Sequence, residues 1–347
     1  MKFTFSDKHS LHAPPFEVMF GNRIPMFERP ERAEELRLAI LAEGHEQTAA
    51  RTFVTEIIES IHDPGLVRHL EGLWREWSQR HSETEIVPDT MLLPAIVDGI
   101  GRPREPAEVE ARLGYWCFDT TTALTEGTYE AARAAVDVAC TAVDVAMSGE
   151  RTSYALCRPP GHHAPRAAYG GYCFFNNAAV ATQHAINQGC ERVAIVDVDY
   201  HHGNGTQQIF YERGDVFYAS IHGSPERAYP YFTGWAEETG AGSGHNANLN
   251  VPLPEGVTDD AYLQELERVA GAVGDFTPDL LVVSLGLDVL AGDPISDFML
   301  TTAGLERMGE LLAQLDVPTA VVQEGGYLLG AIGLAAAAFL RGIENQE

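Results

Sequence analysis

The chain has 347 residues, of which 45% are hydrophobic, and its 50 Asp and Glu against 23 Lys and Arg give a formal net charge of −27. Such a charge argues against electrostatic binding to nucleic acid or to an anionic membrane surface, and it favours a cationic substrate. No stretch approaches the length of a membrane span and no signal peptide is recognisable, so we expect no membrane association and a cytoplasmic location. The five cysteines show no C-x-x-C spacing, which is typical of free thiols in a reducing compartment.

Helices and two irregular segments dominate the first third of the chain. The loop after the first strand is long and rich in His and Pro, and long loops in compact domains are usually functional, so Glu17 becomes a candidate for the rim of a site. Residues 80–113 have scattered Pro and Gly and no hydrophobic period, which predicts an inserted loop. The regular elements predicted here are a strand at 2–5, a helix at 31–43 and two helical pieces within 57–77.

From residue 127 onward, helical patterns alternate with short apolar strands. This alternation predicts an α/β protein, built as one domain around an open, mostly parallel sheet with helices on both faces. In such sheets the ligand site lies outside the carboxyl ends of the strands. A glycine-rich loop at 231–250 is expected to form part of its rim. The predicted helices cover 127–147, 206–213, 259–274 and 328–341, and the predicted strands cover 153–156, 193–196, 216–221, 280–288 and 319–323.

The clearest chemical signal is the stretch 195–205, with the sequence IVDVDYHHGNG, in which a buried strand ends in polar side chains. Asp197, Asp199 and His201 occupy every second position, so strand geometry points them to one face. Two carboxylates at the end of an apolar strand repel each other unless a cation compensates them, and an imidazole adds a nitrogen ligand. A solvated Asp-rich turn is the alternative, but turn aspartates rarely continue the alternation of a strand. The pattern therefore predicts a metal site.

A third ligand is expected from Asp288, which ends the apolar run that begins at Leu280. A metal held by Asp199 and His201 needs at least one more ligand, and the carboxyl end of another parallel strand is where the sheet would supply it. Taken alone, Asp288 would be explained equally well as a helix cap.

Two further motifs lie directly after predicted strands. His162 and His163 are adjacent in a loop rich in Pro and Gly, whose constrained backbone suits paired acid and base groups, and Asp197 remains available as a partner for one imidazole. Tyr327 follows two glycines after the last strand, where it could donate to an oxyanion. The alternatives are satisfied polar histidines and an aromatic ring that packs on the last helix.

Four ordered motifs, HHAP, DVDYHHGNGTQ, LGLDVLAGDP and EGGY, resemble the deacetylase branch of the arginase-deacetylase superfamily, which includes the zinc-dependent histone deacetylases. Within that branch, the segments FSDKHSLHAPPFE, EARLGYWC and GGYCFFNNAAVA resemble the bacterial acetylpolyamine amidohydrolases. The similarity extends over nearly the whole chain. It implies an arginase-deacetylase fold with about eight strands, formed by a single domain over residues 1–347, whose loop at 80–113 takes part in the substrate channel and in a homodimer interface.

The resemblance also implies which residues bind ions. Zinc, with Fe²⁺ as an alternative that suits the same ligands, would be held by Asp199, His201 and Asp288. Potassium would bind beneath the zinc and at a second site, through side chains or backbone carbonyls. The residues implied for potassium are Asp197, Asp199, His201, Ser220, Ile221, Phe210, Arg213 and Val216.

In the same way, the resemblance implies the catalytic groups. His162 and His163 would form a tandem acid and base pair, and Tyr327 would polarise the substrate carbonyl. Asp197 and Asn204 would support the two imidazoles. Because Asn204 stands where some branches have Asp, the sequence leaves open which histidine acts as the base and which as the acid.

Substrate contacts are implied in the two irregular segments and beside the histidine loop. Glu17 and Glu110, both expected to lack basic partners, would be acidic rim residues that meet the distal ammonium of a polyamine. Thr121 stands where close relatives can carry a further Glu, which leaves the preferred amine length open. The walls of the acyl channel would include Gly171, Tyr172 and Tyr229.

The implied reaction removes the acetyl group from a small cationic amine such as acetylputrescine, acetylcadaverine or acetylspermidine, giving free amine and acetate. A protein acetyl-lysine deacetylase would use the same chemistry with a wider mouth. An inactive acetyl-ligand binding protein is disfavoured because the metal ligands and Tyr327 are all present. An arginase-like enzyme with two manganese ions would need more ligands near Asp199.

Overall fold

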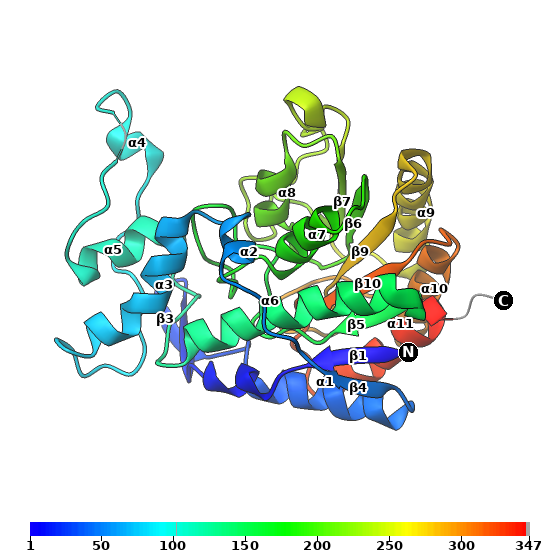
Figure 1. Cartoon of the computed structure of the whole chain (residues 1–347), viewed down its shortest axis with the longest axis horizontal. Helices are drawn as coiled ribbons and strands as arrows, with labels where there is room; N and C mark the ends of the chain where they lie inside the picture. Colours follow the sequence, from blue (N-terminus) through cyan, green and yellow to red (C-terminus); the bar gives the residue numbers. More distant parts are fainter. Residues whose placement is uncertain (102, 345–347) are drawn as a thin grey trace.

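A single large sheet forms the centre of the molecule in the computed structural model, which describes residues 1–101 and 103–344 (Figure 1). The strands are β1 (Lys2–Phe5), β2 (Phe16–Met19), β3 (Asn22–Pro25), β4 (Glu46–Ala49), β5 (Thr152–Ala155), β6 (Val193–Asp197), β7 (Val216–Gly223), β8 (Asn248–Leu253), β9 (Leu280–Leu285) and β10 (Thr319–Gln323). The eight-stranded sheet has the order β4-β1-β5-β10-β9-β6-β7-β8, and β2 and β3 form a separate antiparallel hairpin. Every neighbouring pair in the large sheet is parallel, which confirms the predicted fold class.

Helices cover both faces of this sheet. They are α1 (Pro30–Ala42), α2 (Glu56–Glu59), α3 (Pro64–Trp77), α4 (Pro94–Val97), α5 (Val109–Trp116), α6 (Thr128–Val145), α7 (Asn177–Asn187), α8 (Asn204–Phe210), α9 (Asp259–Phe276), α10 (Thr302–Ala313) and α11 (Ile332–Glu344). Three short turns, η1 (Asp7–Leu11), η2 (Ala146–Glu150) and η3 (Gly242–Gly244), complete the described elements. One core joins the sheet to α3, α6 and α7, and a second core joins its other face to α1, α9, α10 and α11.

The central strands are uninterrupted apolar runs because both of their faces are buried. In β6, Val193 and Ile195 belong to the core that contains α6, whereas Ala194 and Val196 belong to the core that contains α11. Successive side chains of a strand point to opposite faces, so each residue of such a run has a core to enter. The polar residues that follow these runs are therefore placed at the edge of the sheet rather than within it.

The sequence patterns predict the central strands but not the outermost ones. β4 and β8 are the two edges of the sheet, and neither is predicted; β8 begins inside the segment 231–250, which is expected to be a loop. The long loop after β1 contains the β2–β3 hairpin, and α7 and α10 also lack a prediction. The segment 80–113 is not wholly irregular, because it contains α4 and the start of α5.

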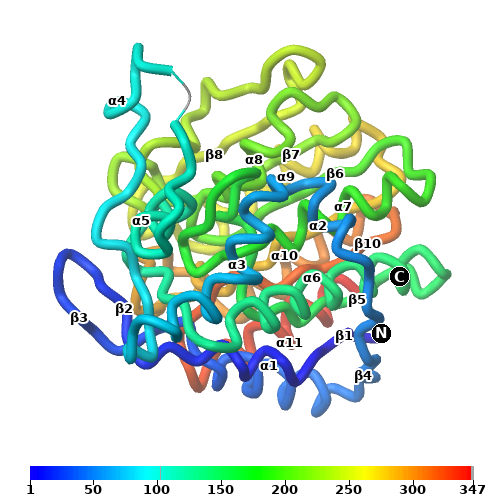
Figure 2. The backbone as a smooth tube through the Cα atoms, turned by 60° about the vertical axis from the view of Figure 1, so that its left-hand side comes forward, coloured from blue at the N-terminus to red at the C-terminus, as the bar shows by residue number. Residues whose placement is uncertain are grey.

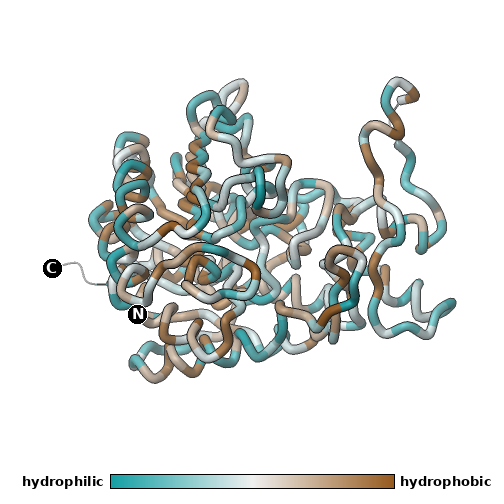
Figure 3. Tube along the Cα trace, turned by 180° about the vertical axis from the view of Figure 1, so that it is seen from behind, coloured by the Kyte–Doolittle hydropathy of each residue, from teal (hydrophilic) through white to brown (hydrophobic). Residues whose placement is uncertain are grey.

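This segment, residues 80–113, projects from the body of the molecule, with α4 near its tip in two different views (Figures 1 and 2). Arg102 lies in it but outside the described residues. Figure 3 shows hydrophobic stretches along the projection, and Leu93, Ile96 and Ile100 have exposed fractions of 59%, 63% and 78%. Among the helices that the structure describes, none has the length and apolar character needed to cross a bilayer.

Candidate functional site

Four neighbouring strands in the middle of the sheet end at one site. They are β5, β10, β9 and β6, in that spatial order. Each leads into candidate residues: His162 and His163 after β5, Tyr327 after β10, Asp288 after β9, and Asp199 with His201 after β6. The structure thus brings together residues that are up to 165 positions apart in the sequence at the carboxyl edge where parallel sheets place their ligands.

The three predicted metal ligands, Asp199, His201 and Asp288, converge, and each offers one ligand atom such that the three atoms lie within 4.8 Å of one another. The Nδ1 atom of His201 lies 2.9 Å from Oδ2 of Asp288 and 3.3 Å from Oδ1 of Asp199. A tetrahedral zinc site with bonds of about 2.0 to 2.2 Å separates its ligand atoms by about 3.4 Å, so this cluster has the right size. Burial and the charge of Asp199 raise the pKa of Asp288 to about 7. A divalent cation held by both carboxylates would favour their ionised forms, so the residues fit a metal site.

Glycine is required where the turn after β10 approaches the predicted metal ligands. The backbone N–H of Gly325 donates to Oδ2 of Asp199 at 2.9 Å. A Cβ atom at this position would lie 2.7 Å from Oδ2 of both Asp199 and Asp288, which is too close for any side chain. The first glycine of the EGGY motif therefore allows the main chain itself to orient a predicted metal ligand, Asp199.

The two histidines of the loop after β5 have different partners. The Nδ1 atom of His162 faces Oδ2 of Asp197 at 3.1 Å, as the sequence predicts for one of the imidazoles. The Nδ1 atom of His163 faces the amide oxygen of Asn204 at 2.8 Å. Burial and the neighbouring His162 lower the pKa of His163. His163 lines the cavity described below, whereas His162 lies behind it.

Glu324, a residue for which the sequence analysis assigns no role, holds the histidine loop in place. Its Oε2 atom accepts hydrogen bonds from the backbone N–H groups of Gly161 at 2.7 Å and His162 at 3.1 Å. Glu324 is completely buried, and burial raises its pKa to about 7. Because Glu324 directly follows β10 and binds the loop after β5, it fixes the position of the histidines relative to Tyr327. Its place directly before the two glycines is the only signal that the sequence offers.

Tyr327 is buried and its ring is enclosed by Arg32 and Tyr172. The guanidinium carbon of Arg32 lies 4.5 Å from the centre of the ring, and the ring of Tyr172 meets it edge-on at 5.7 Å. The backbone N–H of Tyr327 donates to Oδ2 of Asp293 at 2.7 Å. Burial raises the pKa of Tyr327, so its hydroxyl stays protonated and able to donate. The alternative that Tyr327 packs on the last helix is not what the structure shows.

A buried group of charges behind Tyr327 is also missing from the sequence prediction. Oε1 of Glu28 lies 2.7 Å from Nη1 of Arg32 and 2.8 Å from Nε of Arg158. Burial alone would raise the pKa of Glu28, but the charges of the two arginines outweigh this effect and lower it. Buried charges are tolerated only when they are paired, and here two cations share one carboxylate. The excess positive charge lies on the side of Tyr327 where it favours donation by the hydroxyl.

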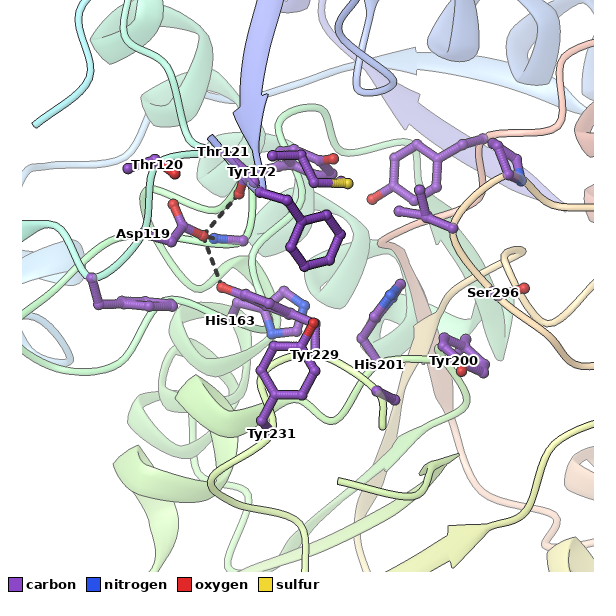
Figure 4. Close-up of a pocket in the computed structure, with 18 of the residues that line it drawn as sticks. Asp119, Thr120, Thr121, His163, Tyr172, Tyr200, His201, Tyr229, Tyr231 and Ser296 are labelled. Carbon is purple, nitrogen blue, oxygen red and sulfur yellow. Dashed lines mark hydrogen bonds between the residues drawn. The ribbon is translucent and has the colours of Figure 1, made fainter. Parts of the chain in front are cut away.

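A cavity of about 560 Å³ leads from the surface to His201, His163 and Tyr327 (Figure 4). Aromatic side chains form much of its wall, among them Phe118, Tyr172, Tyr200, Tyr229 and Tyr231. The rings of His163 and Tyr229 meet edge-on with their centres 5.0 Å apart. A cavity with apolar walls and a few convergent polar groups at its base is the usual form of a small-molecule site.

The predicted channel walls lie in this cavity. Gly171, Tyr172 and Tyr229 all line it. At Gly171 a Cβ atom would come within 2.4 Å of the His163 ring, and the backbone there has a φ of +60°, so the close approach of the wall to His163 requires glycine. Tyr172 follows with a φ of 64°, an uncommon conformation for a residue with a side chain, which the hydrogen bond from its N–H to Thr122 Oγ1 at 2.9 Å helps to hold.

The two glutamates predicted at the rim lie elsewhere. Glu17 belongs to β2 and is completely buried beside Tyr172, and burial raises its pKa to about 7. Glu110 belongs to α5 and does not line the cavity. It has the basic neighbours that the sequence analysis expects it to lack, because its carboxylate lies 2.7 Å from Nε2 of His81 and 3.6 Å from Nη1 of Arg80. Sequence spacing gives no information about these partners, which are 29 and 30 positions away.

Comparison with known proteins agrees with this geometry. The histone deacetylase domain family matches residues 26–343, which is most of the chain. The chain belongs to this family. The matched region includes the predicted metal ligands, both histidines and Tyr327.

Relatives within the histone deacetylase family extend the similarity over the full length. Acetylpolyamine amidohydrolase 1 of Pseudomonas aeruginosa is 42% identical, with 99% of each chain covered. Acetylpolyamine amidohydrolase of Mycoplana ramosa is 40% identical, also with 99% of each chain covered. The crystal structure of acetylpolyamine aminohydrolase from Burkholderia pseudomallei has a TM-score of 0.93 and 37% identity, covering 99% of this chain and 98% of that one.

The residues named for potassium form two groups, one where β6 and β7 lie side by side and one at the start of β7. Asp197 and Ser220 are paired in register on β6 and β7, and Ile221 follows Ser220. Oxygen atoms of the first group are already engaged in part: the hydroxyl of Tyr218 donates to Asp197 Oδ2 at 3.0 Å, and Ser220 Oγ lies 2.8 Å from His222 Nδ1. The second group lies between the end of α8 and the start of β7 and consists of Phe210, Arg213 and Val216.

Proposed function

We propose that this protein is a metal-dependent amidohydrolase that removes acetyl groups from acetylated polyamines of the acetylputrescine, acetylcadaverine or acetylspermidine type. The observation that supports this most directly is the convergence of Asp199, His201 and Asp288 with His163 and Tyr327 at the base of one aromatic-walled cavity. The two full-length relatives and the solved structure described above are named for this activity. The products would be a free amine and acetate.

Zinc is the metal that we propose for Asp199, His201 and Asp288, and Fe²⁺ suits the same oxygen and nitrogen donors. When bound, the metal would polarise the amide carbonyl and lower the pKa of a water molecule. The three protein ligands leave a coordination position open, as catalytic rather than structural zinc sites do.

His163 is the histidine that we assign as the base. It lines the cavity, and because its Nδ1 faces the neutral amide oxygen of Asn204, its Nε2 is free to accept a proton from water. His162 lies behind it, against the carboxylate of Asp197 at 3.1 Å, so its role is electrostatic support. Proton return to the departing amine falls to His163, because it is the member of the pair that reaches the substrate.

Tyr327 would donate a hydrogen bond to the oxyanion that forms when the amide carbonyl is attacked. Its hydroxyl is held at the base of the cavity by the turn from Glu324 to Gly326 and by Arg32. A preorganised donor of this kind stabilises charge that develops only in the transition state. The chain offers no activated serine or cysteine nucleophile in this cavity, since its described lining contains Ser296 but no cysteine.

A protein acetyl-lysine deacetylase is the alternative, and a substrate panel separates the two. Acetylputrescine, acetylcadaverine and acetylspermidine should be cleaved with a higher kcat/KM than acetyl-lysine peptides. A higher kcat/KM for the peptides would replace the polyamine assignment with the protein-deacetylase one. Failure to cleave any acetylated amine with metal bound would refute both.

We further propose that two copies of the chain associate through the projecting segment 80–113. In a monomer, the exposed side chains of Leu93, Ile96 and Ile100 leave apolar surface in contact with water, and a homodimer would bury that surface. The segment could then narrow the mouth of a neighbouring cavity and bring Glu110 to it. Size-exclusion chromatography with light scattering should show a dimer that Ile96→Asp dissociates.

Two finer proposals concern ions and location. Oxygen donors at Asp197, Ser220 and nearby carbonyls would hold potassium, and the melting temperature of the protein should then be higher in potassium than in tetramethylammonium salts.

All five cysteines are buried and free, which supports a reducing compartment such as the cytoplasm. Fractionation of cells that produce the protein would test the location directly.

A further inference from the structure

We propose that Asp119 is the carboxylate that selects substrates with a distal ammonium group. This inference rests on the proposed amidohydrolase function and names a specificity residue for it. Asp119 lines the cavity and is half-buried, between the residues at the base and the outer wall (Figure 4). It replaces Glu17 and Glu110, which the structure places outside the cavity.

Asp119 is held rigidly by four donors. Its Oδ2 atom accepts hydrogen bonds from the N–H of Gly171 at 2.7 Å, from the hydroxyl of Tyr229 at 2.9 Å and from the hydroxyl of Thr121 at 2.9 Å. Its Oδ1 atom accepts a single bond, from the N–H of Thr122 at 3.1 Å. A carboxylate oxygen can accept more than one hydrogen bond, as Oδ2 does here, so Oδ1 retains acceptor capacity. A fixed carboxylate with spare capacity is preorganised to bind a cation at low entropic cost.

All four donors to Asp119 are neutral, so its negative charge is not compensated by hydrogen bonding alone. No Lys, Arg or His among the described residues lies within 4.0 Å of this carboxylate as an ion-pair partner. The cavity has one other carboxylate in its described lining, Asp297, and that one is paired with Arg227. The unpaired negative charge of the cavity is therefore concentrated at Asp119.

The position of Asp119 suits the far end of a short diamine. Tyr229 connects it to the catalytic base, because its ring meets His163 edge-on at 5.0 Å while its hydroxyl bonds Asp119. A substrate with its acetamide at His163 and Tyr327 would extend along this ring, and its ammonium would reach the carboxylate. The aromatic rings of Phe118 and Tyr172 also line the cavity, and aromatic rings are favourable neighbours for a cation.

The test compares two substrates that differ only in charge. Acetylputrescine and N-pentylacetamide have the same length, with an ammonium in one and a methyl group in the other. In Asp119→Asn, which keeps the shape of the side chain, kcat/KM for acetylputrescine should fall by about 10- to 100-fold, as for loss of a hydrogen bond to a charged group. The value for N-pentylacetamide should fall much less, and the preference of the parent protein should weaken as salt concentration rises.

Two control variants separate charge from architecture. Asp297→Asn removes the other carboxylate of the cavity, and Arg227 then keeps Glu255 as its partner at 3.0 Å, so the ratio of the two kcat/KM values should stay close to that of the parent. Tyr229→Phe removes the hydrogen bond that the hydroxyl of Tyr229 donates to Asp119, but the negative charge of Asp119 remains. Its activity is expected to drop on both substrates while the preference for ammonium is retained.

The outcomes distinguish this inference from the proposed function. Equal losses on both substrates in Asp119→Asn would show that Asp119 only braces the wall and would overturn the inference, while the amidohydrolase function would stand. A parent protein that cleaves neither substrate with metal bound would refute the function itself. If Asp119→Asn does not fold, Thr121→Lys provides the same test, because it places a cation beside an intact Asp119: a reduced ammonium preference supports the inference and an unchanged ratio overturns it.

Discussion

The guanidinium of Arg32, on α1, stacks over the ring of Tyr327, which lies 295 positions later in the chain, at 4.5 Å from the ring centre. The same side chain donates to the backbone oxygen of Gly326 at 2.5 Å and to that of Glu324 at 2.9 Å. Arg32 therefore contacts both the aromatic ring and the turn that positions it. A helix outside the catalytic loops sets where the proposed oxyanion donor lies.

Arg32→Lys should lower kcat because lysine keeps the charge opposite Glu28 but does not reproduce the planar contacts with two carbonyl oxygens. Misplacing a catalytic group by about 1 Å can cost about 10²-fold in rate, so we expect a loss of at least about 10-fold. Steady-state kinetics on acetylputrescine would measure it. If Arg32 acts through Tyr327, the double variant Arg32→Lys/Tyr327→Phe should be no slower than Tyr327→Phe alone. If the rate losses of the two single variants multiply in the double variant, Arg32 does not act through Tyr327.

Tyr327→Phe removes one hydroxyl and keeps the ring that Arg32 and Tyr172 enclose. Turnover should fall by roughly 10²-fold or more, as for the loss of one oxyanion donor. The metal content of the purified variant, measured by elemental analysis, should equal that of the parent because Tyr327 is not among the three clustered ligands. A variant as active as the parent would show that the ring only packs.

Removal of the metal should abolish amidase activity, and one equivalent of zinc per chain should restore it. Asp199→Ala should bind zinc far more weakly, since it leaves only His201 and Asp288 from the cluster. Asp260→Ala is a matched control, because Asp260 is an exposed carboxylate on α9 paired with Arg307 at 2.9 Å. Full activity in metal-free protein would exclude a metal-dependent mechanism.

The sequence predicts the site because the strands that lead into the site lie in the middle of the sheet. The runs that end in Asp199 and Asp288 are buried on both faces, so they are continuous apolar segments, and the polar residues that follow them stand out. β4, by contrast, is an edge strand with the sequence EQTA, mostly exposed, and β8 has Pro252 in its ladder. Edge strands need little apolar surface and are often protected by polar residues or proline, so their patterns do not distinguish them from loops.

Contacts between distant loops account for what the sequence does not predict at the site. Asp119 follows Cys117 and Phe118 without a recognisable period, and its role depends on Tyr229, 110 positions later. The partners of Glu110, His81 and Arg80, lie at the opposite end of the segment 80–113, and Arg32 acts on a turn near the other end of the chain. Residue type and spacing identify the reactive residues that follow strands. The rim of the cavity is formed by contacts between residues far apart in the sequence, which spacing does not reveal.

Stability should fall at acidic pH partly because of His62, whose ring is buried and neutral. Its Nδ1 faces the carbonyl oxygen of Pro165 at 3.1 Å, and its Nε2 accepts from the N–H of Asn176 at 2.9 Å. Burial lowers its pKa to about 4, below the usual 6.5 of the unfolded chain. Between pH 4 and pH 6.5 the unfolded state therefore binds more protons than the folded state. The contribution of His62 to the free energy of unfolding is complete above pH 6.5 and is lost as pH falls toward 4.

His62→Gln isolates this effect, because an amide can donate to Pro165 and accept from Asn176 without titrating. Relative to its own value at pH 7.5, the variant should lose less stability at pH 5 than the parent does, by about 2 kcal/mol. Urea unfolding of both proteins at the two pH values would measure the difference, and comparing them at equal metal load removes the contribution of the metal ligands. Parallel pH dependence in parent and variant would mean that His62 titrates near its ordinary pKa in the folded protein, and the buried neutral ring would not be a source of acid sensitivity.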